Sequence, residues 1–381
     1  IVVGGGPAGF MAAIEAARRA KEGGAKLDVT VLEATSKVLG KVKISGGGRC
    51  NVMHDYRKTT KLISEGYPRG QKPLLGPLSR FGPLDTLEWF KKEGVELKIE
   101  DDGRMFPITD NSQTIIDALC GAAERADVKV HTKTRVDDVK LVRDKEQEGI
   151  SFEISCSVRS SRLAYAWATK LGHKLEDPVP SLFTFNIKQK VLDGLAGLAV
   201  QEVWMTVVYS QRGPVLITHT GLSGPAILRL SAFGLFQFLL LSLPLCLVVL
   251  HLLLLSCSSC SSRSSRSVGP APPLLHFPTL NLPRRLWKRI ARCELQVGWT
   301  SLAVPQTYQL GKVEGKGAFK EEFVTAGGVP LPEVDMTKME SKVVPGLFFA
   351  GELLDIDGIT VGGYNLQSAW TTGHAAGRRR G

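Results

Sequence analysis

The sequence predicts an α/β fold: a Rossmann-like dinucleotide-binding domain that is split in the sequence, with an inserted, mainly β domain. Three observations lead to this prediction. A glycine-rich turn separates an apolar strand from an Ala-rich helix near the start, short strands with Gly and Pro turns follow from about 173, and strand, turn and helix return at 346–377. We expect the domain parts at 1–170 and 326–381, and the inserted domain at 171–325.

The first βαβ unit carries a dinucleotide fingerprint. Residues 1–3 and 27–32 predict strands, and 10–21 predicts the helix between them. The turn Gly4-x-Gly6-x-x-Gly9, which includes Pro7 and Ala8, would let the backbone approach a pyrophosphate at the helix N-terminus. Glu33 ends the second strand, where a carboxylate accepts from both ribose hydroxyls and disfavours the 2′-phosphate of NADP.

Two further motifs are rich in glycine. Residues 45–51, Ser-Gly-Gly-Gly-Arg-Cys-Asn, expose a path of backbone N–H groups that can follow a flat or anionic ligand, and Arg49 could meet a phosphate. Residues 351–365 join an apolar strand to a helix through acidic residues and a Gly-Gly pair, which predicts a second ligand cradle. Taken alone, each motif also fits a surface loop.

Other segments predict ordinary elements. Residues 85–93 and 112–126 have helical patterns, and 182–187, 203–209 and 215–218 have strand patterns. The only His/Cys cluster is a Cys257-Ser-Ser-Cys260 pair without a second ligand pair, so no metal site is predicted.

Together the motifs resemble the BaiN-like, aminoacetone-oxidase-like family of FAD-dependent oxidoreductases. The segments that carry the resemblance are GGGPAGFMAAI at 4–14, GK at 40–41, SGGGRCN at 45–51, DGRMFP at 102–107, THTGLSGPAIL at 218–228, TAGGVPLPEVD at 325–335 and 339–377. The segment PSLFTF at 180–185 is most similar to plant and cyanobacterial members.

The resemblance implies FAD as cofactor and assigns residues to it. The ADP half would be held by Gly4, Gly6, Pro7, Ala8, Gly9 and Glu33. The flavin side would be lined by Lys41, Ser45, Gly46, Arg49 and Asn51, with Gly327 near the ring. The cradle would be closed by Gly351, Glu352, Asp357, Gly358, Gly363, Tyr364 and Asn365. No catalytic acid or base is assigned, and His219 is the best polar candidate near a substrate.

The expected function is an FAD-dependent oxidoreductase on a small molecule of unknown identity. A single GxGxxG implies that NAD(P)H, if it is the reductant, docks transiently at the flavin face. The alternatives are a flavin-binding protein without turnover and a protein anchored in a membrane through 235–255. The net charge of +11 comes without a long basic run, so no nucleic-acid partner is expected.

Two segments depart from the family pattern. A strand and its glycine turn are missing before 163, which leaves the catalytic activity open. Residues 232–280 are atypical, and the run at 235–255 is long enough to cross a bilayer, although a spurious insertion or a buried helix would also explain it. Seven scattered cysteines indicate a reducing compartment, cytoplasm or plastid stroma. The start without Met leaves any targeting peptide out of view.

Overall fold

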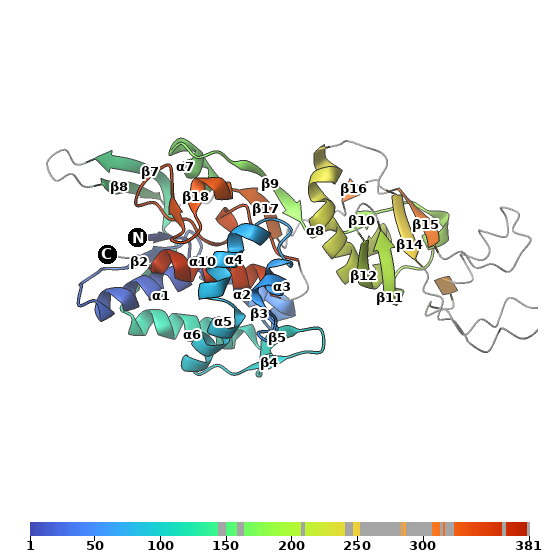
Figure 1. The fold of residues 1–381 in the computed structure, drawn as a ribbon, viewed down its shortest axis with the longest axis horizontal. Coiled ribbons are helices and arrows are strands. Elements are labelled where there is room, and N and C mark those ends of the chain that lie inside the picture. Colours follow the sequence, from blue (N-terminus) through green and yellow to red (C-terminus); the bar gives the residue numbers. More distant parts are fainter. Residues whose placement is uncertain are drawn as a thin grey trace, which may run out of the picture. The chain divides into compact units, whose positions relative to one another are not determined.

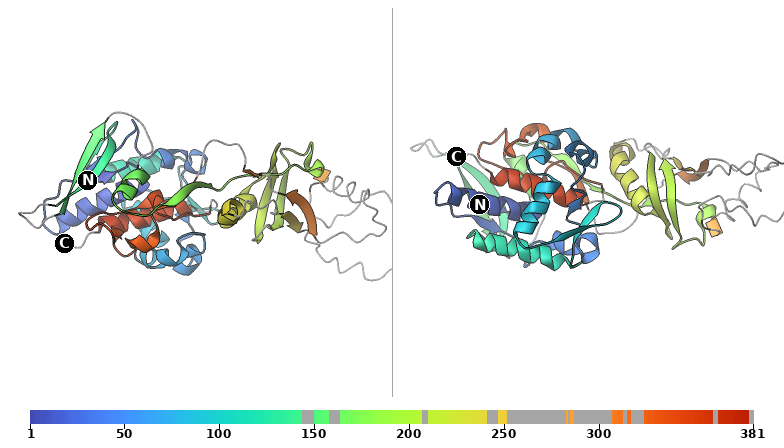
Figure 2. Two further views of the ribbon diagram at one scale, coloured as in Figure 1. Left: turned by 90° about the horizontal axis from the view of Figure 1, so that it is seen from above. Right: turned by 60° about the horizontal axis from the view of Figure 1, so that its bottom comes forward.

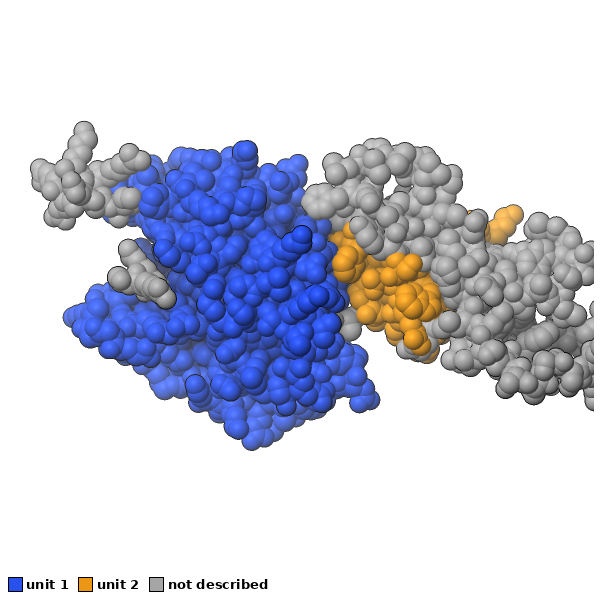
Figure 3. All heavy atoms as spheres, viewed as in Figure 1, with its two compact units in different colours: residues 1–180, 324–381 blue, residues 181–323 orange. Residues whose placement is uncertain are grey.

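The computed structural model describes residues 1–143, 150–157, 164–206, 210–240, 247–251, 283, 285–286, 307–312, 315–316, 324–359 and 363–378. The chain divides into two compact units, one formed by 1–180 with 324–381 and the other by 181–323 (Figure 3). The first unit thus contains both ends of the chain. The predicted domain limits near 170 and 325 stay a prediction.

A parallel sheet organises the first unit. Strands β1 (Val2–Val3), β2 (Thr30–Leu32) and β6 (Lys129–His131) lie in the order β1-β2-β6. The register places Val2 beside Val31, and Val31 beside Val130. Helix α1 (Pro7–Glu22) connects β1 to β2, as the glycine fingerprint predicts, and the Rossmann-type fold is confirmed.

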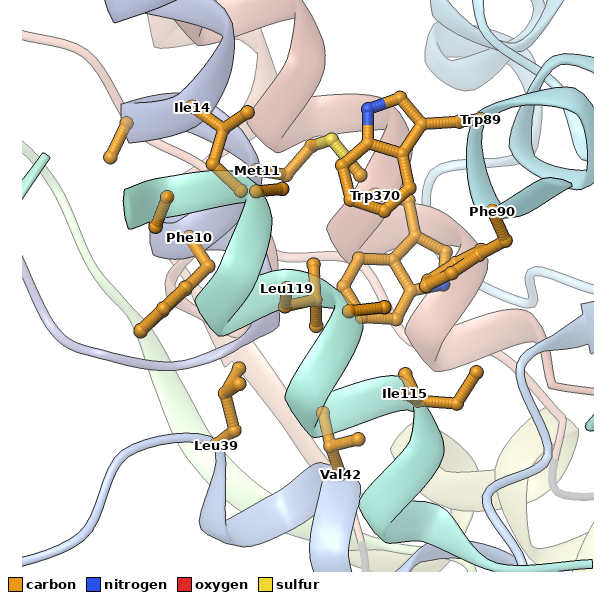
Figure 4. Packing of buried hydrophobic residues seen from close by; sticks show 14 of the residues in the cluster. Phe10, Met11, Ile14, Leu39, Val42, Trp89, Phe90, Ile115, Leu119 and Trp370 are labelled. Atoms are coloured by element: carbon orange, nitrogen blue, oxygen red, sulfur yellow. The ribbon is translucent and has the colours of Figure 1, made fainter. Parts of the chain in front are cut away.

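Three helices contribute to the largest apolar cluster of this unit. They are α1, α6 (Ser112–Arg125) and α10 (Tyr364–Gly377), and α10 runs beside α1 (Figure 1 and Figure 2). Figure 4 shows Phe10 and Ile14 of α1, Leu119 of α6 and Trp370 of α10 in one apolar cluster. Burying such side chains contributes roughly 1.5–3 kcal/mol each, so this cluster fixes the two ends of the chain to one another.

The remaining elements of the first unit are short. Its other helices are α2 (Gly40–Ile44), α3 (Thr60–Ser64), α4 (Gln71–Arg80), α5 (Pro83–Lys92), α7 (Ala164–Lys170) and the 3-10 turns η1 (Ser45–Gly48), η3 (Leu331–Glu333) and η4 (Gly351–Leu353). Its other strands are β3 (Met53–His54), β4 (Leu97–Ile99), β5 (Arg104–Pro107), β7 (Arg135–Arg143), β8 (Ile150–Ser157), β9 (Glu176–Ser181), β17 (Val324–Gly328), β18 (Val334–Asp335) and β19 (Glu340–Ser341). They form four small sheets, β3-β5-β4, β7-β8, β9-β17 and β18-β19.

An antiparallel sheet forms the second unit. Its strands are β10 (Phe185–Asn186), β11 (Ala199–Thr206), β12 (Ser210–Ile217), β13 (Gly221–Ser223), β14 (Leu247–His251), β15 (Thr307–Lys312) and β16 (Gly315–Lys316). Their order is β15-β14-β11-β12-β13-β10-β16. Helix α8 (Pro225–Leu240) packs on β12, and the 3-10 turn η2 (Lys190–Leu192) precedes β11.

The apolar run at 235–255 contributes to this unit. Residues 235–240 continue α8, and residues 247–251 form β14, which pairs with β11 on one side and β15 on the other. Residues 241–246 and 252–255 lie outside the described part, as does the Cys257–Cys260 pair. Among the described helices, none has the length and apolar character that crossing a bilayer requires.

Candidate functional site

The glycine turn before α1 leaves the first turn of the helix open to a ligand. Gly4 has φ +104°, in the left-handed region, and a side chain at Gly9 would meet the Gly4 carbonyl oxygen at 2.1 Å. Gly6 caps α1 without a side chain, Pro7 opens the helix, and the space where a Gly6 Cβ would project is empty within 4 Å. Because the first N–H groups of a helix have no helical acceptors, this end suits a pyrophosphate.

Glu33 ties the end of β2 to that turn. Its Oε2 accepts from Gly5 N–H at 2.8 Å, and its Oε1 accepts from the N–H and the hydroxyl of Thr35, both at 2.8 Å. The carboxylate is therefore held at the edge of the turn, where the fingerprint predicts ribose recognition. Two oxygens offer about four acceptor positions, so one position stays available to a ribose hydroxyl after these three bonds.

Helix α10 runs parallel to α1 because glycines let the two backbones approach. A side chain at Gly373 would lie 2.4 Å from the Ala8 carbonyl oxygen, and one at Gly377 would lie 2.5 Å from the Ala12 carbonyl oxygen. Gly373 lies against Ala8 and the helices run parallel, so Thr372 is level with Pro7, the first residue of α1. Helix α10 begins at Tyr364, eight residues before Thr372. At 1.5 Å per residue, the N-terminus of α10 lies about 12 Å beyond that of α1.

The N-terminus of α10 meets the segment that follows the triple glycine. Gly363 caps the helix with φ +71° and packs on the backbone of β3, where a side chain would lie 2.6 Å from Met53 Cα. The Asn51 side-chain oxygen accepts from Gly363 N–H at 2.8 Å. The structure therefore brings two predicted cofactor residues, Asn51 and Gly363, together at the far end of the cradle.

Tyr364 is held inside the protein. Its ring lies 5.1 Å from the His54 ring and 5.5 Å from the Tyr67 ring, and its carbonyl oxygen accepts from Tyr67 Oη at 2.8 Å. Burial, and then the nearby ammonium of Lys58, lowers the pKa of His54 to about 4, so this imidazole is neutral at physiological pH. Tyr364 is 5% exposed and belongs to the wall of the cradle in this structure.

The triple glycine forms an open loop. Gly46, Gly47 and Gly48 all have left-handed φ angles, and no atom lies within 4 Å of where a side chain at Gly47 or Gly48 would project. Ser45 Oγ donates to the Val42 carbonyl at 2.9 Å. The loop is thus open on this side, and its predicted contact with a flat ligand stays a prediction.

Arg49 is engaged elsewhere. Its guanidinium contacts the carboxylates of Glu100 and Asp110 and lies 4.0 Å from the centroid of the Phe106 ring. The contact with a phosphate that the sequence suggests would compete with two carboxylates. Its predicted role at the flavin stays a prediction.

The segment 351–358 contacts both halves of the unit. Glu352 pairs with Lys41 and accepts from Thr325 N–H at 3.0 Å, so two predicted cofactor residues are again neighbours. Gly351 N–H donates to Thr372 Oγ1 on α10 at 2.9 Å. The cradle is thereby closed on this side by residues from opposite ends of the sequence.

The loop 355–358 is held from three sides. Asp357 has no exposed surface and pairs with Arg69, which lies just before α4. Gly327 N–H donates to Asp355 Oδ1 at 3.1 Å, and Asn365 bonds both the N–H and the carbonyl of Gly358, at 2.7 and 3.0 Å. Asp357 therefore meets Arg69 in this structure. Sequence reasoning did not find Arg69 or His54, because neither lies in a glycine motif.

Comparison with known proteins identifies the family. The family model described as HI0933-like protein Rossmann domain matches residues 1–379. The chain belongs to this family. Its members are FAD-binding flavoenzymes, so the predictions of the BaiN-like resemblance and of FAD as the cofactor are confirmed at this level.

The chain is also similar to curated proteins along nearly its full length. It is 29% identical to a 3-dehydro-bile acid delta(4,6)-reductase of Clostridium scindens, over 99% of this chain and 97% of the relative. It is 28% identical to a ribosomal RNA dihydrouridine synthase of Escherichia coli, over 98% and 96%. A solved 3-ketosteroid delta1-dehydrogenase of Sterolibacterium denitrificans is 11% identical, with a TM-score of 0.49 over 99% of this chain and 98% of that one.

The observed geometry fits FAD. Two helix N-termini about 12 Å apart along parallel axes suit a ligand with an anionic group in its middle and a polar ring at one end. Glu33 contacts the turn that precedes α1, and Asn51, which follows the open glycine loop, contacts the cap of α10. The expectation that nucleic acid is no partner is not confirmed, since one relative is named for ribosomal RNA.

Proposed function

We propose that this protein is an FAD-dependent reductase that takes electrons from NAD(P)H and saturates a carbon–carbon double bond conjugated to a carbonyl. The structural observation that supports bound FAD is the parallel packing of α1 and α10, which sets two helix N-termini in one unit. When bound, FAD would supply the two-electron chemistry, with NAD(P)H oxidised and a hydride and a proton added across the substrate double bond.

The residues of the chain would bind and orient the cofactor. Glu33 would accept from the adenosine ribose, and the first N–H groups of α1 would donate to the pyrophosphate. The first N–H groups of α10 would face the pyrimidine side of the flavin ring, where negative charge develops on reduction. Asn51 would keep this end in place through Gly363.

The names of the two curated relatives support the substrate class. A delta(4,6)-reductase of a 3-dehydro bile acid and a dihydrouridine synthase both, by name, saturate a double bond, although one substrate is a small molecule and the other is RNA. We favour a small molecule for this chain, because its positive charge is scattered in the sequence without a long basic run.

A flavin-binding protein without turnover is the second candidate. The hairpin β7–β8 ends at Ser157 and α7 begins at Ala164, so few residues remain for the strand that family members carry here. This short connection favours the second candidate. Both candidates predict bound FAD, and they differ in whether the flavin is reduced and reoxidised.

The test begins with the purified full chain. The first proposal predicts a yellow protein that releases FAD, and not FMN, on denaturation, and whose absorbance near the flavin maximum bleaches under anaerobic NADH or NADPH. Addition of a conjugated enone steroid should then restore the colour, whereas a uridine-containing ribosomal RNA fragment should not. A protein that stays colourless after incubation with FAD would contradict both candidates. Bound FAD that no nicotinamide reduces would favour the second.

A further inference from the structure

Arg49 connects the triple-glycine loop to the hairpin formed by β4 and β5. Its guanidinium carbon lies 4.0 Å from the centroid of the Phe106 ring, and this ring has no exposed surface. Its Nε and Nη2 donate to Asp110 Oδ1 at 2.9 and 2.7 Å, and Nη2 also donates to Glu100. The side chain is therefore held by one aromatic ring and two carboxylates.

The Phe106 ring that Arg49 covers also supports the start of the loop. Gly46 has φ +58°, and a side chain there would lie 2.9 Å from Phe106 Cε1 and 2.8 Å from the backbone nitrogen of Asn51. The loop thus packs closely on Phe106 and folds back on itself. Asn51, at the end of the loop, bonds the Gly363 cap of α10. The position of this bond therefore depends on how the loop rests on Phe106.

The two carboxylates belong to the segment around the hairpin and stay charged. Glu100 directly follows β4, and Asp110 lies between β5 and α6. The ammonium of Lys98 and then the guanidinium of Arg49 lower the pKa of Asp110 below its usual value. A cofactor phosphate would have to displace Arg49 from both carboxylates before it could bond this side chain.

We infer that Arg49 is a positioning residue, which holds the loop from Gly46 to Asn51 on the hairpin for the flavin ring and does not bond the cofactor phosphates. This inference deepens the proposed function and rests on it, because it requires FAD beside the loop. A planar guanidinium can stack on a ring and bond carboxylates at its edge at the same time, which an ammonium cannot do. Glu100 and Asp110 then assist FAD binding. If Arg49 bonded a phosphate instead, both carboxylates would compete with FAD.

The first test uses the sign of the effect of Asp110→Asn. Asp110 has φ +51°, a left-handed conformation that asparagine also adopts, so the variant keeps the backbone and an acceptor but loses the charge. The Kd for FAD should rise about threefold, the order expected for one partly exposed ion pair. A phosphate contact predicts a lower Kd. Asp102→Asn is the matched control, because it removes the same charge from the same hairpin at a carboxylate that pairs, among the described residues, with Arg104.

The second test compares ligands that carry either half of FAD. Riboflavin has the ring without phosphate, and ADP has the pyrophosphate without the ring. In Arg49→Lys the Kd values for FAD and riboflavin, from flavin fluorescence, should rise by the same factor, about fivefold for a lost stacking contact. The Kd for ADP, from competition with FAD, should equal that of Arg80→Lys. This control changes an exposed arginine of α4 that contacts, among the described residues, the carbonyls of Met336 and Thr337. Weaker ADP binding with unchanged riboflavin binding would overturn the inference.

A spectroscopic readout separates positioning from general stability. At saturating FAD, the visible circular dichroism of the bound flavin should change in Arg49→Lys, since the ring then meets a displaced loop. A lower melting temperature with an unchanged flavin spectrum would mean a merely structural role and would overturn the inference. If Arg49→Lys is insoluble, the near-isosteric Asp110→Asn still decides by sign. A wild-type protein that does not bind FAD would overturn the proposed function and this inference together. A wild-type holoprotein whose Asp110→Asn variant binds FAD as tightly as Asp102→Asn, or more tightly, would overturn the inference alone.

Discussion

Replacing Glu33 with Ala should weaken FAD binding more than the loss of one ribose contact would. The carboxylate accepts three internal hydrogen bonds, including one from Gly5 N–H in the turn that is predicted to face the pyrophosphate. A hydrogen bond to a charged group contributes about 1.5–3 kcal/mol. Losing the ribose bond and loosening the turn should therefore cost about 3 kcal/mol, on the order of 100-fold in Kd.

The assay is a titration of apoprotein with FAD, followed by flavin fluorescence. Glu33→Gln, which keeps an acceptor but introduces an N–H₂ group opposite existing donors, should fall between wild type and Glu33→Ala. Glu22→Ala is the matched control, since Glu22 is exposed at the C-terminal end of α1 and, among the described residues, approaches Arg19 at 3.9 Å. A Glu33→Ala protein that binds FAD within threefold of the control would refute the assigned role of the carboxylate.

Three further predictions follow from the packing. Gly373→Val should lower both the melting temperature and the FAD content, because its Cβ would meet a backbone carbonyl at 2.4 Å. Gly76→Ala is the control, because the nearest atoms to its Cβ belong to the Arg80 side chain at 3.8 Å. This variant should leave the FAD content unchanged and should keep or raise the melting temperature. Replacing 252–273 with a Gly/Ser linker should preserve the soluble yield. Replacing 235–273 should reduce it, because the longer replacement removes β14. Equal yields of the two variants would exclude a role for β14 in folding. Burial lowers the pKa of His374 to about 4 from 6.5 in the unfolded chain, so its contribution to stability is present above pH 6.5 and declines as the pH falls toward 4. Between pH 6.5 and 4, the melting temperature of His374→Gln should fall less than that of the wild type. An equal fall in both proteins would contradict the burial argument.

Much of the nucleotide-binding unit could be predicted because its signals are local. The helices expected at 85–93 and 112–126 correspond to α5 and α6 within about two residues, and the fingerprint places α1 between two parallel strands. Glu33 could be predicted as a candidate ribose ligand because it stands at the end of β2. Such features depend on residues close in sequence, where periodicity and turn chemistry decide the structure.

Other features depend on contacts between distant segments. Nothing local to Asp357 indicates that its carboxylate pairs with Arg69, so the motif alone assigns it to the ligand. The apolar run at 235–255 has no period that separates a strand from a helix, and β14 is defined by pairing with β11 and β15. The cofactor roles of the nineteen predicted site residues stay predictions for the variants above to test.

The glycine contact between α1 and α10 has a consequence for biosynthesis. A ribosome delivers the chain from its N-terminus, so Ala8 emerges long before Gly373, its packing partner near the other end of the 381 residues. Until that partner arrives, the first βαβ unit lacks a face of its core, and closing so long a loop is entropically costly and slow. FAD that reaches the nascent chain early would meet only half of its cradle. Cofactor loading is therefore expected only after Gly373 has left the ribosome, and a shortage of FAD at that moment would leave the apolar face of α1 exposed to chaperones and proteases.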